Sequence, residues 1–305
     1  MTEKNVTNEK NITLCAYAKI NLFLDITGVR PDGYHTITGV MHNTLLCDHV
    51  MVSVAPRQPH IPTIRLTCDN PDLPTDRKNL GYRAAEAFLK AMAWEEDSPI
   101  CIEIDIKKRI PAAAGMAGGS TNAAAVLRGL NILLDEPLDE ETLRRVGLTL
   151  GADVPFCLAG GTQITEGIGE KLSPLPTLPY VPMVVACGGE GVSTPQAYQA
   201  LDQMYNRFDG TNYAPKYDKL TAQLQALQAG DIAGVAQNAY NIFEEVVLPH
   251  HPVARKIKLV MQEHGAMLSM MSGSGPSVFG FFPTPTAAIA VANTLKEMGI
   301  SAWAL

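Results

Sequence analysis

The segment with the clearest chemical signal runs from Pro111 to Thr121 and reads Pro-Ala-Ala-Ala-Gly-Met-Ala-Gly-Gly-Ser-Thr. Its glycines at 115, 118 and 119 let the backbone approach a ligand closely, and Ser120 or Thr121 can cap the helix that follows. Free amides and the helix dipole at such a helix start bind phosphate, so the segment is a candidate phosphate cradle. No lysine follows the glycines, so it is not a Walker A loop. A plain strand-to-helix connection would have the same composition.

Lys19 and Asp153 are the charged residues that could take part in a group transfer. Lys19 shares a strand face with Asn21, and the aromatic residues around them favour a lined cleft, although a lone lysine on a strand usually faces water. A cation on a rigid strand is well placed to stabilise a carboxylate or a phosphoryl group. Asp153 is either the N-cap of a helix that contains Pro155 or a general base for a hydroxyl, and the two roles are compatible.

Two short segments could contact other parts of a ligand. Tyr34 and His35 follow a turn at Gly33, and a Tyr–His pair can stack on a base and hydrogen-bond to it. The second glycine-rich turn, residues 270–277, could close over an anion through Ser272 and freed amides. Either segment could equally be an ordinary exposed turn or hairpin.

Other catalytic constellations are missing from the sequence. It contains no His-Glu-x-x-His, Gly-x-Ser-x-Gly or Gly-x-Gly-x-x-Gly, which disfavours zinc hydrolases, serine hydrolases and dinucleotide-binding proteins. No two of the six cysteines have Cys-x-x-Cys or metal-knuckle spacing, so we expect inert thiols in a reducing compartment.

The candidate residues need strands and helices to position them. Alternation of side-chain types over 12–26 predicts a long strand that carries Lys19, and the same pattern over 100–106 predicts a strand before the glycine-rich segment. Apolar residues at helical spacing predict a helix after that segment and another over 139–149, which Gly151 closes just before Asp153.

The remaining pattern divides the chain in two. Three prolines within 173–179 mark the best boundary, because proline disrupts both helices and sheet pairing. Further strands are expected over 36–54, 61–68, 180–187, 267–271 and 277–282, and further helices over 79–93, 194–205, 215–229, 231–246, 251–264 and 284–298.

Composition predicts a soluble, cytoplasmic protein. Of the 305 residues, 46% are hydrophobic and 18% are charged, which suffices for a sizeable core in two domains. The formal net charge of −7 disfavours nucleic acid as the main partner, because phosphate backbones bind basic surfaces. The polar start, 1–11, is unlike a signal peptide, and no apolar run approaches the ~20 residues of a membrane span. The sequence leaves the oligomeric state open.

Four segments occur together and in order: 18–24 with 30–35, the segment 111–125, residues 151–155 and residues 272–275. This arrangement resembles the galactokinase, homoserine kinase, mevalonate kinase and phosphomevalonate kinase (GHMP) superfamily. Ala-Lys-Ile-Asn-Leu-Phe-Leu followed by Asp-Gly-Tyr-His is similar to the members that phosphorylate a cytidine-diphosphate-linked methylerythritol in the non-mevalonate route to isoprenoid precursors.

The resemblance implies an α+β, two-domain GHMP kinase fold, with a ribosomal-protein-S5-like domain over 1–175 and a ferredoxin-like domain over 176–305. It implies an ATP-dependent kinase that phosphorylates the 2-hydroxyl of such a small-molecule alcohol, with Mg²⁺ as cofactor. It assigns catalysis to Lys19 and Asp153, and a Mg²⁺ contact to Ser120. It places ATP at Asn79, Pro111, Ala112, Ala113, Ala114, Gly115, Met116, Ala117, Gly118, Gly119, Ser120 and Thr121, and the substrate at Asn21, Tyr34, His35 and Tyr198.

One departure from the family pattern concerns the three alanines that fill the first half of the glycine-rich segment. Alanine penalises positive φ, so we expect the half from 115 to 120 to make more of the phosphate contacts. Two alternative functions stay open: a kinase for another sugar or amino-acid alcohol on the same scaffold, and a nucleotide-binding protein without catalysis.

Overall fold

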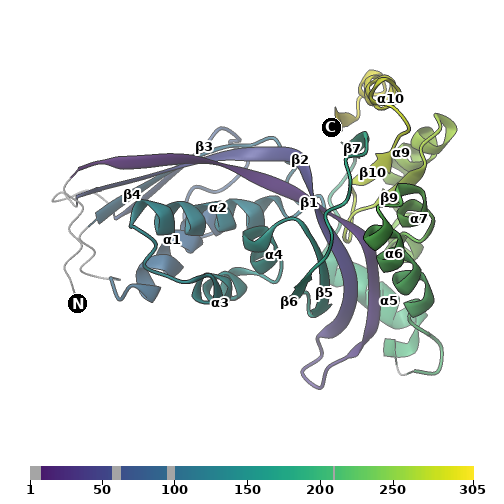
Figure 1. Ribbon diagram of the computed structural model, residues 1–305, viewed down its shortest axis with the longest axis horizontal. Helices are drawn as coiled ribbons and strands as arrows, with labels where there is room; N and C mark the ends of the chain where they lie inside the picture. Colours follow the sequence, from purple (N-terminus) through teal and green to yellow (C-terminus); the bar gives the residue numbers. More distant parts are fainter. Residues whose placement is uncertain (1–7, 57–62, 95–99, 209) are drawn as a thin grey trace. The chain divides into compact units, whose positions relative to one another are not determined.

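The computed structural model describes residues 8–56, 63–94, 100–208 and 210–305 (Figure 1). They form two compact units, and neither is continuous in sequence. Unit 1 comprises residues 1–18, 47–112 and 117–159, and unit 2 comprises residues 19–46, 113–116 and 160–305. The chain passes from one unit to the other several times, so the units do not correspond to two consecutive domains. The predicted domain boundary near residue 175 therefore stays a prediction.

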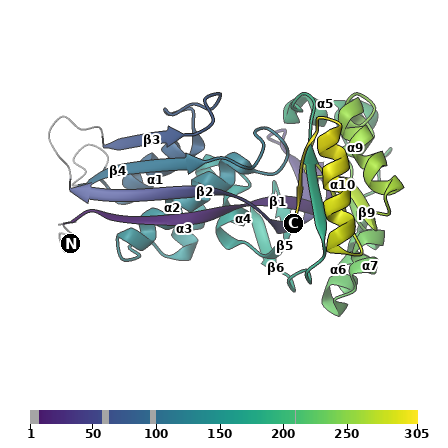
Figure 2. The ribbon, with the colours of Figure 1, turned by 90° about the horizontal axis from the view of Figure 1, so that it is seen from above.

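Unit 1 is a sheet with helices on one face. The strand order is β3-β4-β2-β1, with β4 antiparallel to β2 and parallel to β3. Figure 2 shows these strands in front of the helices α1 and α2, which cover the opposite face, and α3 packs on these two helices. The elements are β1 (Lys10–Val29), β2 (His35–Pro56), β3 (Ile64–Cys68), β4 (Ile100–Lys107), α1 (Leu80–Ala91), α2 (Gly118–Leu133), α3 (Glu140–Leu150) and α4 (Val154–Ala159).

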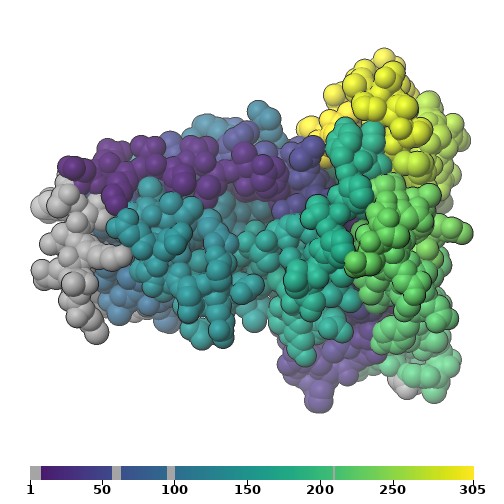
Figure 3. All heavy atoms as spheres, viewed as in Figure 1, coloured from purple at the N-terminus to yellow at the C-terminus, as the bar shows by residue number. Residues whose placement is uncertain are grey.

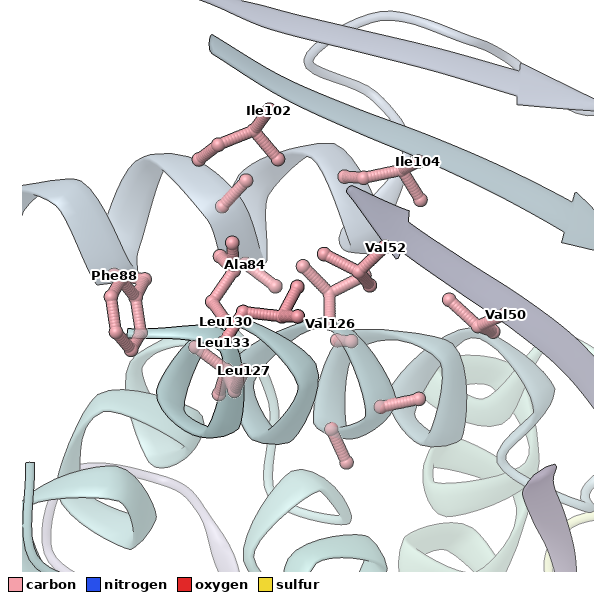
Figure 4. Close-up of a cluster of buried hydrophobic side chains, with 14 of the residues drawn as sticks. Val50, Val52, Ala84, Phe88, Ile102, Ile104, Val126, Leu127, Leu130 and Leu133 are labelled. Carbon is pink, nitrogen blue, oxygen red and sulfur yellow. The ribbon is translucent and has the colours of Figure 1, made fainter. Parts of the chain in front are cut away.

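Period-two alternation builds the core of unit 1. In β4 the isoleucines at 100, 102, 104 and 106 are all buried, while Glu103 and Lys107 are exposed. They meet the apolar stripes of α1 and α2, and Figure 4 shows Ile102 and Ile104 above Val126 and Leu130. Each such side chain contributes about 1.5–3 kcal/mol on burial, so this face holds the helices to the sheet.

Unit 2 contains a sheet of four antiparallel strands in the order β11-β7-β10-β9. Counted along the chain, these are the fourth, first, third and second strands of the sheet. This is the ferredoxin-like order that the family resemblance predicts. Helices α9 and α10 pack their apolar faces on this sheet (Figure 1). The elements are β7 (Met183–Cys187), β9 (Leu268–Met271), β10 (Val278–Phe281), β11 (Ser301–Ala304), α9 (Pro252–Glu263) and α10 (Pro285–Glu297).

The rest of unit 2 surrounds the second half of β1 and the first half of β2. Strand β5 pairs antiparallel with β2 and with β6, and β8 pairs parallel with β1 at Phe23 and Leu24. These elements are β5 (Thr162–Gly167), β6 (Lys171–Pro174), β8 (Tyr240–Asn241), α5 (Thr194–Met204), η1 (Asn206–Phe208), α6 (Tyr217–Ala229), α7 (Ile232–Gln237) and α8 (Glu244–Val247).

Most predicted elements agree with the structure, but the single helix predicted over 231–246 is wrong. The chain forms α7, then the two-residue strand β8, then α8. Pairing of β8 with β1 supplies backbone hydrogen bonds that the helix would otherwise have made, so a tertiary contact overrides the local pattern. The first residues of the predicted strand 61–68 lie outside the described residues. Among the helices of the described residues, none combines the length and apolar composition that crossing a bilayer requires.

Candidate active site

Lys19 and Asn21 form a buried pair on β1 in unit 2. Lys19 is 4% exposed and Asn21 is 1% exposed, which rules out the solvated strand face that a lone lysine usually takes. The Lys19 Nζ donates to the Asn21 Oδ1 at 2.7 Å. Among the described residues the buried Nδ2 of Asn21 has no hydrogen-bond partner. A buried donor without a partner calls for a ligand or water, which supports Asn21 as a binding residue.

The first part of the glycine-rich segment lies beside this pair. The Lys19 backbone amide donates to the Met116 carbonyl at 3.2 Å. Gly115 has φ of +75°, and a Cβ there would lie 2.2 Å from the Ser272 carbonyl oxygen, so only glycine fits. The Ser272 hydroxyl donates to the Gly115 carbonyl at 3.2 Å. The second glycine-rich turn is therefore part of the same site and is not merely a hairpin.

Gly273 brings that turn directly to the lysine. A Cβ on Gly273 would lie 3.3 Å from the Lys19 Nζ and 2.9 Å from the Gly115 carbonyl oxygen. The buried side chain of Asn241 holds the turn in place, since its Nδ2 donates to the carbonyls of Met271 at 2.7 Å and Gly273 at 2.8 Å. Sequence reasoning missed Asn241, because it lies inside the stretch predicted as one helix and no local pattern links it to residue 273.

The second part of the glycine-rich segment belongs to unit 1 and begins α2. The prediction that Ser120 or Thr121 caps this helix is wrong: α2 begins at Gly118, after Ala117 in the left-handed region with φ of 57°, and none of the described side chains caps it. The Thr121 hydroxyl instead donates to the Tyr17 carbonyl at 2.8 Å. The first-turn amides have no partner within the helix, and the positive end of the helix dipole favours an anion beside them.

Asp153 lies in unit 1, directly before α4, in which Pro155 is the second residue. Asp153 is partly exposed and its carbonyl accepts from the Cys157 amide at 3.0 Å. A Cβ on Gly151 would lie 3.9 Å from the Ser120 hydroxyl oxygen. The loop that carries Asp153 therefore adjoins the start of α2, where the phosphate cradle was predicted.

A buried ionic network anchors the chain just before this cradle. Asp48, fully buried on β2, pairs with the Lys108 ammonium and accepts from the Asn122 Nδ2 at 2.8 Å. It also accepts from the backbone amides of Arg109 at 2.6 Å and Ile110 at 2.8 Å, immediately before Pro111. Sequence reasoning missed Asp48, although a signal existed: it occupies an inward position of a strand whose inward neighbours are apolar.

The residues predicted to hold the substrate base are near one another in unit 2. His35 stacks on Tyr198 with ring centroids 4.6 Å apart, and its Nε2 lies 2.7 Å from the Asp202 Oδ1. Phe208 meets the His35 ring edge-on at 5.8 Å. Tyr34 is 61% exposed, so its ring is available to a ligand. Tyr198 therefore lies against His35, and its substrate role stays a prediction.

The rings of His35, Tyr198 and Phe208 form an aromatic wall. Asp25 lies on the same face of β1 as Lys19 and helps to hold this wall in place. It is fully buried and accepts from the Lys216 amide at 2.7 Å and from the Tyr213 hydroxyl. Tyr213 packs edge-on against Phe208 at 5.3 Å. Burial raises the pKa of the Asp25 carboxyl, and its hydrogen bonds oppose that shift.

Asn79 has a structural role that the resemblance did not imply. It is the N-cap of α1: its Oδ1 accepts from the Gly81 amide at 2.8 Å, and its Nδ2 donates to the Pro74 carbonyl at 2.8 Å. An adenine contact by Asn79 would therefore compete with these bonds, and its ATP role stays a prediction.

Comparison with known proteins identifies the class. The family profile of the GHMP kinases N terminal domain matches residues 79–161, and that of GHMP kinases C terminal matches residues 223–301. A crystal structure of L. major mevalonate kinase in complex with R-mevalonate superposes with a TM-score of 0.74 at 16% identity, over 96% of this chain and 94% of that one. At that identity the likeness shows the fold alone.

Nearer relatives narrow the class. The chain is 40% identical over 299 residues to the 4-diphosphocytidyl-2-C-methyl-D-erythritol kinase of Nostoc punctiforme, covering 94% of this chain and 92% of the relative. It is 43% identical over 272 residues to that of Gloeobacter violaceus, covering 89% and 85%. A crystal structure of 4-(cytidine 5'-diphospho)-2C-methyl-D-erythritol kinase matches with a TM-score of 0.74 and 32% identity, over 96% and 98% of the chains.

The chain therefore belongs to the GHMP kinase family, and within it to the 4-diphosphocytidyl-2-C-methyl-D-erythritol kinases. It is an ATP-dependent small-molecule kinase, and the predicted α+β GHMP kinase fold is confirmed.

Proposed function

We propose that the chain transfers the γ-phosphate of ATP to the 2-hydroxyl of 4-diphosphocytidyl-2-C-methyl-D-erythritol. The observation that carries the proposal is the buried Lys19–Asn21 pair beside residues 113–116 and the 272–275 turn, in a chain of this family. The unpartnered Nδ2 of Asn21 and the aromatic wall at His35 supply the contacts that a nucleotide-bearing alcohol requires.

In the proposed reaction, the substrate hydroxyl oxygen attacks the γ-phosphorus while the bond from that phosphorus to the bridging oxygen of ADP breaks. The hydroxyl proton passes to the Asp153 carboxylate, which acts as general base. The Lys19 ammonium offsets the negative charge that develops on the transferred group. The backbone amides of residues 115–120, which include the start of α2, hold the triphosphate.

The site also fits a Mg²⁺ ion. Ser120 is in the first turn of α2, and a hydroxyl oxygen is the type of ligand that this hard cation accepts beside phosphate oxygens and waters. When bound, the ion would neutralise negative charge on the phosphates during transfer. Ser120 would hold it, and no other protein ligand is proposed.

Replacing Asp153 by asparagine tests the assignment of the base. In a coupled assay of ADP release, turnover of the cytidine-diphosphate alcohol should fall about 10²–10⁴-fold, the usual contribution of a general base, while ATP still binds. Asp139→Asn is the matched control: Asp139 is the N-cap of α3 in the same unit, and asparagine also caps helices, so turnover should hold. Near-normal turnover by Asp153→Asn would remove Asp153 from this role.

A substrate panel separates the two alternative functions. The cytidine-diphosphate alcohol should be preferred over homoserine, mevalonate and galactose, because only it can use the aromatic wall at His35 and Tyr198. Preference for another alcohol would favour a different kinase on this scaffold. Absence of ADP release with every alcohol would favour nucleotide binding without catalysis.

A further inference from the structure

Cys15 of β1 lies beside Cys47 and His49 of β2 on unit 1. Their sulfur and nitrogen atoms all lie within 4.8 Å of one another. Cys15 is exposed, and Cys47 and His49 are half-buried. Sequence spacing could not reveal this cluster, because residues 15 and 47 meet only when β1 and β2 pair.

Strand geometry explains why these three side chains share one face. Side chains two residues apart on a strand point the same way, so Cys47 and His49 lie together while Asp48 between them points into the core. Helices α1 and α2 cover the other face of the sheet (Figure 2). Figure 3 shows atoms of the first half of β1, in purple, at the surface of unit 1. A small ion in solution can therefore reach the cluster.

We propose that Cys15, Cys47 and His49 bind one Zn²⁺ ion, with water as the fourth ligand. Two thiolates and an imidazole are the donor set that zinc prefers, whereas Mg²⁺ prefers oxygen. A tetrahedral ion with bonds of about 2.3 Å to sulfur needs its two sulfurs roughly 3.8 Å apart. The cluster is already within 4.8 Å, so side-chain rotation alone can close the site.

The surroundings are compatible with this ion. Two thiolates neutralise the charge of the zinc ion, and the neighbouring cations, Lys107 opposite His49 on β4 and Arg109 near Cys47, disfavour further positive charge. The site is thus expected to hold one divalent ion with both thiols deprotonated, which releases protons on binding. None of the three ligands takes part in the proposed phosphoryl transfer. A failed test of the zinc site would therefore leave the proposed kinase function unaffected, and the reverse also holds.

The test uses Co²⁺ as a spectroscopic probe of the full chain, after reduction and removal of metals by a chelator. Titration should produce thiolate-to-cobalt charge-transfer absorption and the intense visible bands of tetrahedral Co²⁺, saturating at one ion per chain, and Zn²⁺ should displace them. Cys15→Ser, Cys47→Ser and His49→Ala should each weaken binding at least about tenfold, since loss of even an outer-shell partner costs that much.

Two further thiols of unit 1 provide matched controls. Cys68→Ser and Cys157→Ser remove half-buried thiols outside the cluster and should leave the spectrum unchanged. Circular dichroism checks the fold of each variant. X-ray absorption of the zinc-loaded unmodified chain needs no variant and should show two sulfur neighbours and one imidazole. Only oxygen and nitrogen neighbours, no charge-transfer band, or a band that survives both Cys15→Ser and Cys47→Ser would overturn the proposal.

Discussion

Asp48→Asn would remove one charge from a buried ion pair of unit 1. The carboxylate accepts from the Lys108 ammonium, from Asn122, and from the backbone amides of Arg109 and Ile110. Asparagine keeps the shape but offers a single acceptor oxygen and turns an NH₂ group toward a donor. It also leaves the Lys108 ammonium without its counter-charge. The Lys108 side chain is only 7% exposed, so water cannot replace that charge well.

Burial sets the expected magnitude. Breaking one side of a buried ion pair costs about 3–5 kcal/mol, because the remaining charge stays desolvated and unpaired. With a urea m-value of about 2 kcal/mol per molar, the unfolding midpoint should fall by roughly 2 M. Since Asp48 holds the two amides before Pro111, the loosened glycine-rich segment should also raise the KM for ATP.

The two tryptophans of the chain allow unit 1 to be followed alone. Trp94 packs against the core of unit 1, and Trp303 lies in β11 of unit 2. In a Trp303→Phe background, urea unfolding monitored by Trp94 fluorescence reports on unit 1. Adding Lys108→Met to Asp48→Asn removes both charges, so the double variant should recover part of the lost stability.

An exposed pair in the same unit provides the control. Arg128 and Glu140 form a salt bridge with side chains that are 32% and 56% exposed, and Glu140→Gln should cost no more than about 1 kcal/mol. If Asp48→Asn costs as little as Glu140→Gln, or if Lys108→Met further destabilises it, the reasoning from burial is refuted.

Three other predictions concern the site and its supports. Gly115→Ala should lower kcat/KM by about 100-fold, since a misplacement of about 1 Å can cost that much. Gly161→Ala is the control, because Gly161 has a φ of +71° against +75° for Gly115, but a Cβ at Gly161 would have no atom within 4 Å. Equal activities of the two variants would contradict the steric argument. Ala117→Gly should stabilise the chain by about 1 kcal/mol, because a left-handed alanine is strained, and calorimetry showing an unchanged or lower Tm would contradict this. Burial lowers the pKa of His42 to about 4 from 6.5, so its contribution to stability is present above pH 6.5 and is lost as the pH falls toward 4. Between pH 7 and pH 5, the free energy of unfolding of the unmodified chain should fall by about 2 kcal/mol more than that of the His42→Gln variant.

The sequence determined the elements and the residue types of the site. Alternation over β1 and β4, and helical spacing over α2 and α3, follow from local side-chain preferences, so those elements could be predicted. The order of the lysine, the glycine-rich segment and Asp153 along the chain sufficed to indicate the family. These patterns repeat within a few residues, and the physical forces behind them act at that range.

Only the tertiary structure decided which distant residues meet. The Asn241 amide on the carbonyl of Gly273, the Ser272 hydroxyl on that of Gly115, and the cluster of Cys15 with Cys47 all join residues that are distant along the chain. Pairing of β8 with β1 likewise replaces the single helix predicted over 231–246. Local propensities amount to tenths of a kcal/mol per residue, about 0–0.7 for ordinary residues, so burial and pairing across the fold outweigh them wherever the two disagree.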